Sequence, residues 1–414
     1  MEEPDPLLRR QSDLESDDKG DPSPFEALIS PLDADTFIDE YFNREMLHLC
    51  GDAGRFASLI DWSDLDQLLA HNRLEPPRLR LSRGGKEIDP SKYTRQRRGA
   101  RDIDAGATTT LLRQGATLAV GFADELLPSL RAIAEDAEQL LGARVNVNIY
   151  AGWGTASGFN PHYDRHDVLA VQVRGRKRWR VAEPEFAHPT GRDHHRPAPS
   201  DERFGFDTIL ESGDVLFLPR GWWHEAIPLG EESLHITIAM SPPTAHNVLD
   251  WLAPRLEQSV IGRADVPPPC RPEARKAYFA ELLQAIEAQF DGDISEDFAR
   301  SREAERPAAP RFDLSSIGKG LPAIDRATGV LLASEKRVDE HREDDESLRV
   351  VLGGRNWPCD PRFLPALRLL RSYRSTSFGE LSATLADSAQ EDGLRGFIQM
   401  LAAGGAVFLE SGKC

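Results

Sequence analysis

The sequence lacks the features that mark membrane, secreted and disulfide-stabilised proteins. No apolar run approaches the roughly 20 residues that cross a bilayer, and nothing near Met1 resembles the apolar core of a signal peptide. The four cysteines, Cys50, Cys270, Cys359 and Cys414, are scattered and form no Cys-x-x-Cys pair. Neither a disulfide framework nor a thiolate zinc motif is indicated. We therefore expect a protein of a reducing cytoplasm that does not associate with membranes.

Positive charge is also in short supply. The 414 residues include 50 Lys and Arg against 68 Asp and Glu, which gives a formal net charge of −18. Nucleic-acid binding depends on cations that neutralise phosphates, so direct contact with nucleic acid is not expected. An acidic surface is compatible with a basic protein partner.

Length and composition predict several domains, because 414 residues exceed one ordinary core. Residues 1–24 are polar, charged and interrupted by proline, which predicts a disordered tail. Residues 25–245 begin with a mostly helical stretch, to about Leu141, and continue as a strand-rich block from Val145 to about Met240. Residues 246–305 read as amphipathic helices joined by the proline-rich link "ADVPPPCRP". There is no internal repeat.

The remaining segment, residues 306–414, ends with "SFGELSATL" and "GLRGFIQMLAAGGAVFLE". These stretches predict a helix, a second helix and a short closing strand, which is the order of a winged helix. Winged helices often bind nucleic acid, but residues 311–414 carry 14 Lys and Arg against 15 Asp and Glu. This balance is a poor footprint for phosphate and favours a structural or protein-binding role.

One short stretch, "NPHYDRHDV", concentrates groups that can bind a metal. If it forms a strand, His162 and Asp164 project from the same face, because side chains alternate along a strand. One more imidazole would complete the two-histidine, one-carboxylate set that holds Fe(II) with open coordination positions. Taken alone, the His-x-Asp pair is most often an ordinary surface feature.

A third ligand is available in "SGDVLFLPRGWWHEA". Residues 215–218 predict a buried strand, and Pro219 to Gly221 a tight bend that leads to His224 between bulky side chains. A packed core histidine is the simpler interpretation of this motif by itself. Because the two motifs occur together, with strands between them, we predict one metal site formed by His162, Asp164 and His224.

The segment "DVLAVQVRGRKRWRVAEP" predicts a β-hairpin that turns at Arg174-Gly175-Arg176. In the returning strand, alternation groups Lys177 with apolar Trp179 and Val181. A buried ammonium requires an anion, and a dicarboxylate cosubstrate would supply one. The alternative is that Lys177 reaches solvent from the strand end, and spacing alone does not decide between the two.

On these motifs, residues 146–242 resemble the JmjC-type 2-oxoglutarate oxygenases. The whole arrangement from Phe25 to the C-terminus is similar to their ribosomal-oxygenase branch. The resemblance implies an α+β fold: a double-stranded β-helix (cupin, or jelly-roll) barrel with a helical N-terminal surround, a helical dimerisation segment and a C-terminal winged helix. It also implies hydroxylation of an arginine or histidine side chain in a protein substrate, such as a basic ribosomal protein.

The resemblance further assigns roles to individual residues. His162, Asp164 and His224 match the iron ligands of the family, and Lys177 matches the residue that holds the distal carboxylate of 2-oxoglutarate. Asn148 and Tyr150 lie on the strand before the triad, where relatives place further cosubstrate or pocket contacts. The implied cofactors are Fe(II), 2-oxoglutarate and O2. The charged run Arg165-His166-Asp167 is unusual and leaves substrate choice open.

The helices of residues 246–305 carry an apolar stripe at helical spacing. Its members are Tyr278, Phe279, Leu282, Leu283, Ile286 and Phe290. We expect a homodimer through this stripe, with packing against the chain's own barrel as the alternative.

Three other functions stay open at this point. The chain could modify a peptide natural-product precursor, it could demethylate a methylated side chain, or it could be a non-catalytic cupin-like binding protein.

Overall fold

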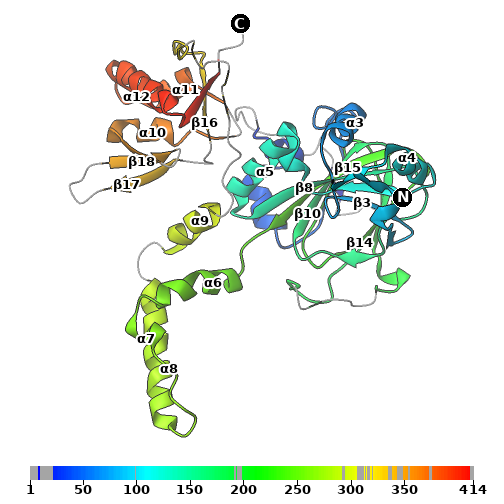
Figure 1. Cartoon of the computed structure of the whole chain (residues 1–414), viewed down its shortest axis with the longest axis horizontal. Helices are drawn as coiled ribbons and strands as arrows, with labels where there is room; N and C mark the ends of the chain where they lie inside the picture. Colours follow the sequence, from blue (N-terminus) through cyan, green and yellow to red (C-terminus); the bar gives the residue numbers. More distant parts are fainter. Residues whose placement is uncertain are drawn as a thin grey trace. The chain divides into compact units, whose positions relative to one another are not determined.

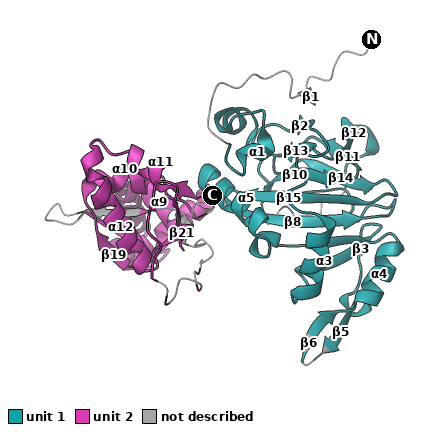
Figure 2. Cartoon of the chain, turned by 90° about the horizontal axis from the view of Figure 1, so that it is seen from above, with its two compact units in different colours: residues 1–242 teal, residues 243–414 magenta. Residues whose placement is uncertain are grey.

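The computed structural model describes residues 8–9, 22–97, 99–190, 193, 198–290, 294–304, 312, 314, 318, 320–333, 338–342, 348–352, 355–372 and 375–410. Most of the tail predicted for residues 1–24 lies outside the described residues. The chain divides into two compact units, Met1–Pro242 and Pro243–Cys414 (Figure 2). Within the described part of the chain, no helix is both long and apolar enough to span a bilayer.

The first unit is built on two β-sheets (Figures 1 and 2). The larger sheet has nine strands in the order β1 (Leu8–Arg9), β2 (Leu47–Leu49), β13 (Val215–Leu218), β10 (Asp167–Arg174), β15 (Ser233–Ser241), β8 (Arg144–Gly152), β7 (Thr117–Val120), β3 (Leu79–Arg83), β4 (Lys86–Glu87). The smaller sheet has the order β12 (Phe206–Leu210), β11 (Lys177–Ala182), β14 (Trp223–Pro228), β9 (His162–Tyr163). This arrangement agrees with the cupin-like barrel predicted for residues 25–245.

Antiparallel pairing dominates the barrel, and it explains the hydrophobic pattern of the strand-rich block. The central strand β15 pairs with β10 on one side and β8 on the other. Eight of its nine residues are buried, and only Ser241 is exposed. One face of the strand, with Leu234, Ile236 and Ile238, packs in the main core. The opposite face carries His235 and Thr237, which line a cavity.

The predicted hairpin at Arg174-Gly175-Arg176 is wrong. β10 pairs with β13 and β15 in the larger sheet, whereas β11 pairs with β12 and β14 in the smaller one. Gly175 has φ +62°, and a Cβ there would collide with the backbone carbonyl of Glu232. The glycine bend therefore carries the chain from one sheet to the other, a step that local turn signals do not distinguish from a hairpin.

The expectation of a mostly helical stretch from residue 25 to about Leu141 is only partly correct. Its helices are α1 (Glu26–Ile29), α2 (Ala34–Thr36), α3 (Trp62–His71), α4 (Ala105–Arg113) and α5 (Pro128–Leu141). Between them, β2, β3, β4 and β7 extend the larger sheet, and β5 (Thr94–Arg97) pairs with β6 (Ala100–Ile103). The alternating Leu79 and Leu81 are both fully buried in β3, so the period-two pattern of a strand was present there.

Local sequence signals mark one end of each of two helices. Asp61 and Asp64 form a reciprocal capping box at the start of α3. Gly142, with φ +58°, follows α5 in the left-handed conformation that glycine adopts most easily. Two buried carboxylates add long-range contacts: Asp136 accepts a hydrogen bond from the Phe25 N–H, and Asp124 accepts one from the Val147 N–H.

The second unit holds a helical segment and a separate α+β segment (Figure 1). The helices are α6 (Ala245–Leu256), α7 (Val260–Arg263), α8 (Pro272–Glu287) and α9 (Ile294–Ala304). The later elements are β16 (Gly329–Leu332), β17 (Asp339–Arg342), β18 (Leu348–Leu352), β19 (Arg355–Pro358), α10 (Leu364–Leu367), β20 (Thr376–Ser377), α11 (Phe378–Ala383), α12 (Glu391–Ala403) and β21 (Val407–Glu410). The second hydrophobic core draws its buried residues from Ile324 to Leu409.

The predicted order of two helices and a closing strand is present in α11, α12 and β21. Strand β16 pairs with both β20 and β21 in one small sheet. Along the sequence, α11 and α12 connect β20 to β21. Strands β17, β18 and β19 form a second three-stranded sheet.

Phe217, on β13, is central to the core of the first unit. Its ring is fully buried and meets the Phe37 ring edge-on at a centroid distance of 5.0 Å. Phe217→Ala should lower the free energy of unfolding of this unit by about 3–5 kcal/mol, because it removes buried apolar surface and leaves a cavity. Urea unfolding followed by tryptophan fluorescence measures the change. Ile209→Ala, at a side chain that is 42% exposed on β12, should cost far less; equal losses would contradict this assignment.

Candidate metal centre and its cavity

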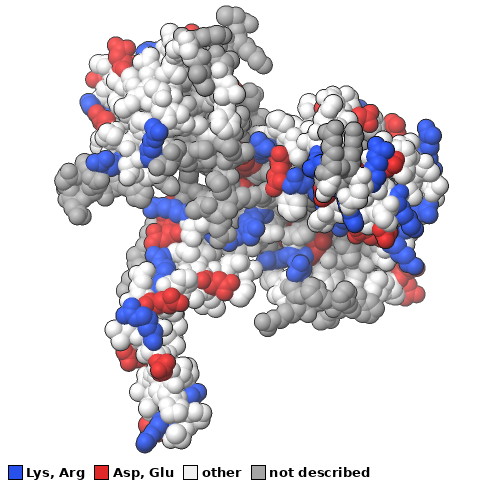
Figure 3. All heavy atoms as spheres, viewed as in Figure 1, with Lys and Arg blue, Asp and Glu red and all other residues white. Residues whose placement is uncertain are grey.

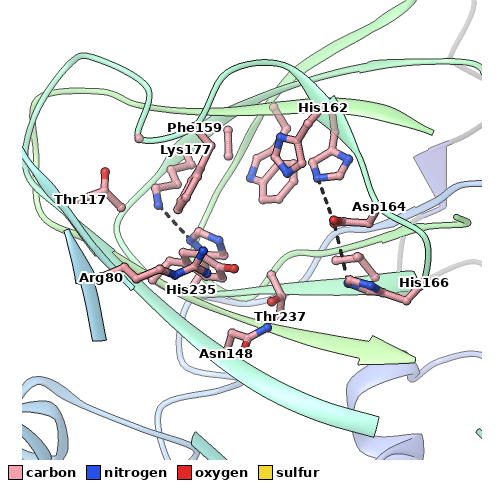
Figure 4. Close-up of a pocket in the computed structure, with 16 residues that line it drawn as sticks. Arg80, Thr117, Asn148, Phe159, His162, Asp164, His166, Lys177, His235 and Thr237 are labelled. Atoms are coloured by element: carbon pink, nitrogen blue, oxygen red, sulfur yellow. Dashed lines mark hydrogen bonds and ion pairs between the residues drawn. The ribbon is translucent and has the colours of Figure 1, made fainter. Parts of the chain in front are cut away.

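A cavity of about 360 Å³ lies between the two sheets of the first unit (Figure 4). Its lining comes from both sheets and from the segments on either side of β9. The lining residues are Arg80, Thr117, Asn148, Tyr150, Gly158, Phe159, His162, Asp164, His166, Val168, Lys177, Trp179, His224, Ala226, His235 and Thr237. All six residues singled out from the sequence are among them.

His162, Asp164 and His224 converge on one side of this cavity. Each offers a ligand atom, and these atoms all lie within 4.8 Å of one another. His224 lies directly opposite His162 in the antiparallel pairing of β14 with β9. The strand at His162 is only two residues long, so Asp164 follows it rather than belonging to it. The ligands therefore meet as predicted, although strand alternation is not what brings Asp164 into place.

Backbone carbonyls orient both imidazoles toward the cluster. His162 Nδ1 lies 2.8 Å from the Asn160 carbonyl oxygen, and His224 Nδ1 lies 3.1 Å from that of Trp222. A carbonyl can only accept, so each Nδ1 carries the proton and each Nε2 keeps a free lone pair. His224 Nε2 is 3.6 Å from an Asp164 carboxylate oxygen. Histidine metal ligands commonly donate their second ring N–H to a backbone carbonyl in the way that these two Nδ1 atoms do.

The protonation states also suit metal binding. Burial lowers the pKa of His224, and the neighbouring His162 lowers it further, so the imidazole is neutral at pH 7. Burial would raise the pKa of Asp164, but the surrounding histidines, His166 first among them, bring it below its usual value. At neutral pH the cluster therefore presents a neutral imidazole at His224 and a carboxylate at Asp164.

The bend before β14 is fastened to the ligand segment at two points. The Gly221 N–H donates to the Asp164 carbonyl oxygen at 2.9 Å, and the Arg220 N–H donates to the Asp167 carboxylate at 2.7 Å. Gly221 has φ +92°, a conformation that favours glycine. Burial raises the pKa of Asp167 to about 6. This bend fixes the position of His224, as the Pro-x-Gly motif predicted.

Lys177 points inward rather than reaching solvent, which decides between the two alternatives that the sequence left open. Its side chain is 2% exposed, and Trp179 and Val181 on the same face of β11 are buried as well. Lys177 Nζ lies 3.0 Å from His235 Nδ1. Burial lowers the pKa of the lysine to about 7. Within the described residues, no carboxylate lies within ion-pair distance of this ammonium, which leaves an anion to be supplied from outside.

Asn148 and Tyr150 both line the cavity from β8. The Asn148 side-chain oxygen accepts a hydrogen bond from the Phe122 N–H at 3.3 Å, which anchors the amide. The Tyr150 ring stacks on the His235 imidazole, with centroids 4.9 Å apart. Burial raises the pKa of the Tyr150 hydroxyl, so it remains a neutral donor at neutral pH. Contact of these two residues with a cosubstrate stays a prediction.

Sequence reasoning missed three cavity residues. His166 was not among the residues assigned to the site from the sequence, but it lines the cavity with Nε2 3.8 Å from Asp164. Strand alternation does not apply to it, since β9 ends at Tyr163. His235 and Arg80 also face the cavity. The polar alternation of "SLHITIAM" was a signal for His235, whereas Arg80 lay in a stretch expected to be mostly helical.

A second group of potential metal ligands consists of His48, Cys50 and Asp214. Both oxygens of the Asp214 carboxylate already accept backbone hydrogen bonds, from the Gly51 N–H and the Glu211 N–H. The His48 Nδ1 is buried with no hydrogen-bond partner among the described residues, whereas the Nδ1 atoms of His162 and His224 contact backbone carbonyls. We interpret this group as a structural contact between β2 and the turn before β13.

Comparisons with known proteins agree with this site. Residues 125–248 match the family model of the JmjC domain. Ribosomal oxygenase 2 of Rattus norvegicus is 32% identical over 228 residues, which are 52% of this chain and 46% of that protein. The Drosophila mojavensis protein named bifunctional lysine-specific demethylase and histidyl-hydroxylase NO66 is 28% identical over 247 residues, which are 57% of this chain and 26% of that protein. The chain thus spans less than half the length of these curated relatives.

The fold itself extends over almost the whole chain in Escherichia coli YcfD, described as a ribosomal oxygenase. That structure has a TM-score of 0.56 and 19% sequence identity, and the match covers 92% of this chain and 99% of YcfD. A second YcfD structure, with cobalt and 2-oxoglutarate bound, also matches with a TM-score of 0.56. At this level of identity the likeness concerns the fold. Residues 125–248 of this chain thus match the JmjC domain, and they include the His162, Asp164 and His224 cluster of the barrel.

Proposed function

We propose that the chain is an Fe(II)- and 2-oxoglutarate-dependent oxygenase that hydroxylates an arginine or histidine side chain of a protein, such as a ribosomal protein. One observation carries the proposal: a three-ligand metal cluster and a buried lysine with no carboxylate partner among the described residues share one cavity. The names of the relatives, which include histidyl-hydroxylase and ribosomal oxygenase, support the same reaction class.

The donor set fits Fe(II). Two imidazoles and one carboxylate form the facial triad of non-haem iron oxygenases, which leaves coordination positions for substrates. His162 and His224 would bind through Nε2, because each Nδ1 is held by a backbone carbonyl. Asp164 would supply the anionic ligand. A closed structural zinc site would need a fourth protein ligand, and the cluster found among the described residues has three.

The charge of the cavity fits a dicarboxylate. Its cationic side chains are Arg80 and Lys177, and its one carboxylate, Asp164, belongs to the metal cluster. 2-Oxoglutarate would place its 2-oxo acid end at the metal and its distal carboxylate at Lys177, with Asn148 and Tyr150 beside it. When bound, Fe(II) with 2-oxoglutarate and O2 supplies the oxidant that inserts oxygen into a C–H bond. The chain holds the metal, orients the dicarboxylate and lines the site with Phe159 and Trp179, which limit water.

In this proposal the substrate is a protein rather than a small molecule. The chain would act in the cytoplasm. Residues 25–245 would be catalytic, residues 246–305 would form the dimerisation segment, and residues 306–414 would form a winged helix that contacts protein. Because Arg80 and Lys177 line the cavity, attraction for a basic substrate would come from the outer surface in this proposal. Tailoring of a peptide natural-product precursor, demethylation of a methylated side chain and non-catalytic binding are the alternatives, and product analysis separates them.

We also propose that two copies associate through α8. None of its residues is buried within the chain. Phe279 and Leu283 on the helix, and Phe290 just after its end, are each about half exposed. Figure 3 shows the segment of α7 and α8 as largely uncharged surface between scattered charges of both signs. A helix with such a stripe is stabilised when an apolar partner covers it. A second copy would present the same stripe and form a self-complementary contact.

The metal assignment and the reaction can be tested together. Wild-type enzyme with Fe(II), 2-oxoglutarate and O2 should add one oxygen atom to a ribosomal protein or peptide, as detected by mass spectrometry. His224→Ala should abolish both the product and the tight binding of Fe(II) or Co(II), because two ligands form a much weaker site. His246→Ala, which changes an exposed histidine of α6, is the matched control and should behave as wild type. Unchanged turnover of the His224 variant would refute the metal assignment.

Lys177→Ala should weaken 2-oxoglutarate binding by about 2–5 kcal/mol, the usual cost of removing one partner of a buried charge pair. The affinity for metal should persist, since Lys177 is not among the ligands. Isothermal titration of metal-loaded protein with 2-oxoglutarate measures the change. Arg178→Ala on the same strand is the control, because Arg178 points outward and pairs with Asp207. If the Lys177 variant keeps wild-type affinity, another residue holds the distal carboxylate.

The association of two copies predicts a sensitivity to charge on α8. Phe279→Glu combined with Leu283→Glu should convert a dimer into monomers in multi-angle light scattering, because carboxylates would be buried at the contact. Gln284→Glu, at an exposed position of the same helix, should leave the dimer intact. A wild-type chain that is monomeric at micromolar concentration would exclude this contact.

A further inference from the structure

The lysine of the cavity is held by a histidine. Lys177 Nζ, on β11, lies 3.0 Å from His235 Nδ1, on β15, so the contact joins the two sheets (Figure 4). Both side chains are almost completely buried, at 2% and 4% exposure. When Lys177 is charged, its ammonium can only donate, and His235 Nδ1 then accepts the hydrogen bond. His235 is the hydrogen-bond partner of this ammonium within the described residues.

The imidazole of His235 is neutral and its ring is fixed. Burial, and then the charge of Lys177, lower its pKa well below the usual value. Because Nδ1 accepts, the ring proton lies on Nε2. The ring stacks on the Tyr150 ring, with 10° between the planes. It is T-shaped to the Trp179 ring, with the two ring centroids 5.7 Å apart. Two aromatic neighbours therefore hold the acceptor in one orientation.

A neutral acceptor at this place has a different effect from a carboxylate. A buried carboxylate would neutralise the ammonium in an internal ion pair and compete with any anion that entered the cavity. An apolar residue would leave the ammonium without a partner, which favours the uncharged amine and a mobile side chain. An imidazole satisfies one N–H of the ammonium and leaves its charge for an incoming anion.

We propose that His235 is a positioning residue that holds Lys177 by a neutral hydrogen bond, so that the ammonium remains available to the distal carboxylate of a bound dicarboxylate. This inference rests on the proposed function, since it assigns the dicarboxylate to 2-oxoglutarate. His235 acts through Lys177 and is not expected to touch the reacting atoms. It should therefore govern affinity for the distal carboxylate and leave the metal site unchanged.

The test compares two 2-oxo acids on metal-loaded protein without oxygen. 2-Oxoglutarate carries the distal carboxylate and 2-oxobutyrate does not, and the charge-transfer absorbance of their Fe(II) complexes reports binding of each. His235→Leu should weaken 2-oxoglutarate binding roughly tenfold or more, as expected for loss of a hydrogen bond to a charged group. Its affinity for 2-oxobutyrate should equal that of wild type. Thermal unfolding checks that each variant is folded.

Asparagine and aspartate provide a matched pair of variants at this position. His235→Asn places an amide oxygen near the site of Nδ1 and should retain most of the 2-oxoglutarate affinity. His235→Asp has nearly the same volume but adds a competing charge, and it should lose more affinity than His235→Leu. This pair keeps the test valid if the leucine variant does not fold.

Dependence on Lys177 is tested by a double-mutant cycle. In a Lys177→Met background, His235→Leu should cause no further loss of 2-oxoglutarate affinity, because the two residues act as one unit. A wild-type protein that binds neither 2-oxo acid would overturn the proposed function itself. If wild type binds 2-oxoglutarate but the His235 variants bind it equally well, or lose both 2-oxo acids in parallel, the function stands and the positioning role fails.

Discussion

The pairing of β9 with β14 is the constraint on which the metal centre depends. It sets His162 opposite His224, two residues that are 62 positions apart in the sequence, with ring centroids 4.4 Å apart. β9 is only two residues long and would not be stable as an isolated strand. It is held because the backbone carbonyl of Asp164 accepts the Gly221 N–H, and because the carboxylate of Asp167 accepts the Arg220 N–H. Asp167, in the charged run that follows Asp164, thus has a structural role.

The two ends of the cavity differ in how their charges are satisfied. At the metal end, one carboxylate lies among histidines that are themselves oriented by backbone carbonyls. At the other end, a buried lysine meets a neutral imidazole. Burial is costly for both groups unless a metal cation and an anion complete them. The apo cavity therefore has an electrostatic arrangement that a metal with a dicarboxylate would complement along its length.

The second unit is stabilised by a different logic. Its α+β segment has a core of its own, whereas α8 has no buried residue and a low density of apolar contacts. Helix α8 has 16 residues and begins at Pro272. A helix of this length gains little stability from the helix propensity of its residues alone. Phe279 and Leu283 remain half exposed, and covering this apolar surface with a partner would stabilise the helix.

The sequence by itself determined the ligands and the buried strands, because these depend on local patterns. His162 and Asp164 are two residues apart, His224 follows a tight Pro-x-Gly bend, and Lys177 alternates with Trp179 and Val181. Each pattern constrains backbone direction over a few residues. Alternation accounts for the shared burial of Lys177, Trp179 and Val181 on β11, whereas Asp164 lies beyond the end of β9 and is not placed by it. Nearby residues likewise account for the capping box of α3 and the glycine after α5.

Only the tertiary structure decided which strands are neighbours and which polar groups share a cavity. The bend at Gly175 connects two sheets rather than two strands of a hairpin, because β-strand partners are chosen by barrel closure and not by the turn. His235 is 58 residues from Lys177, and His166 departs from strand geometry, so spacing could not place either one in the site. Contacts across long separations depend on how the two sheets pack, which the period of a single strand does not encode.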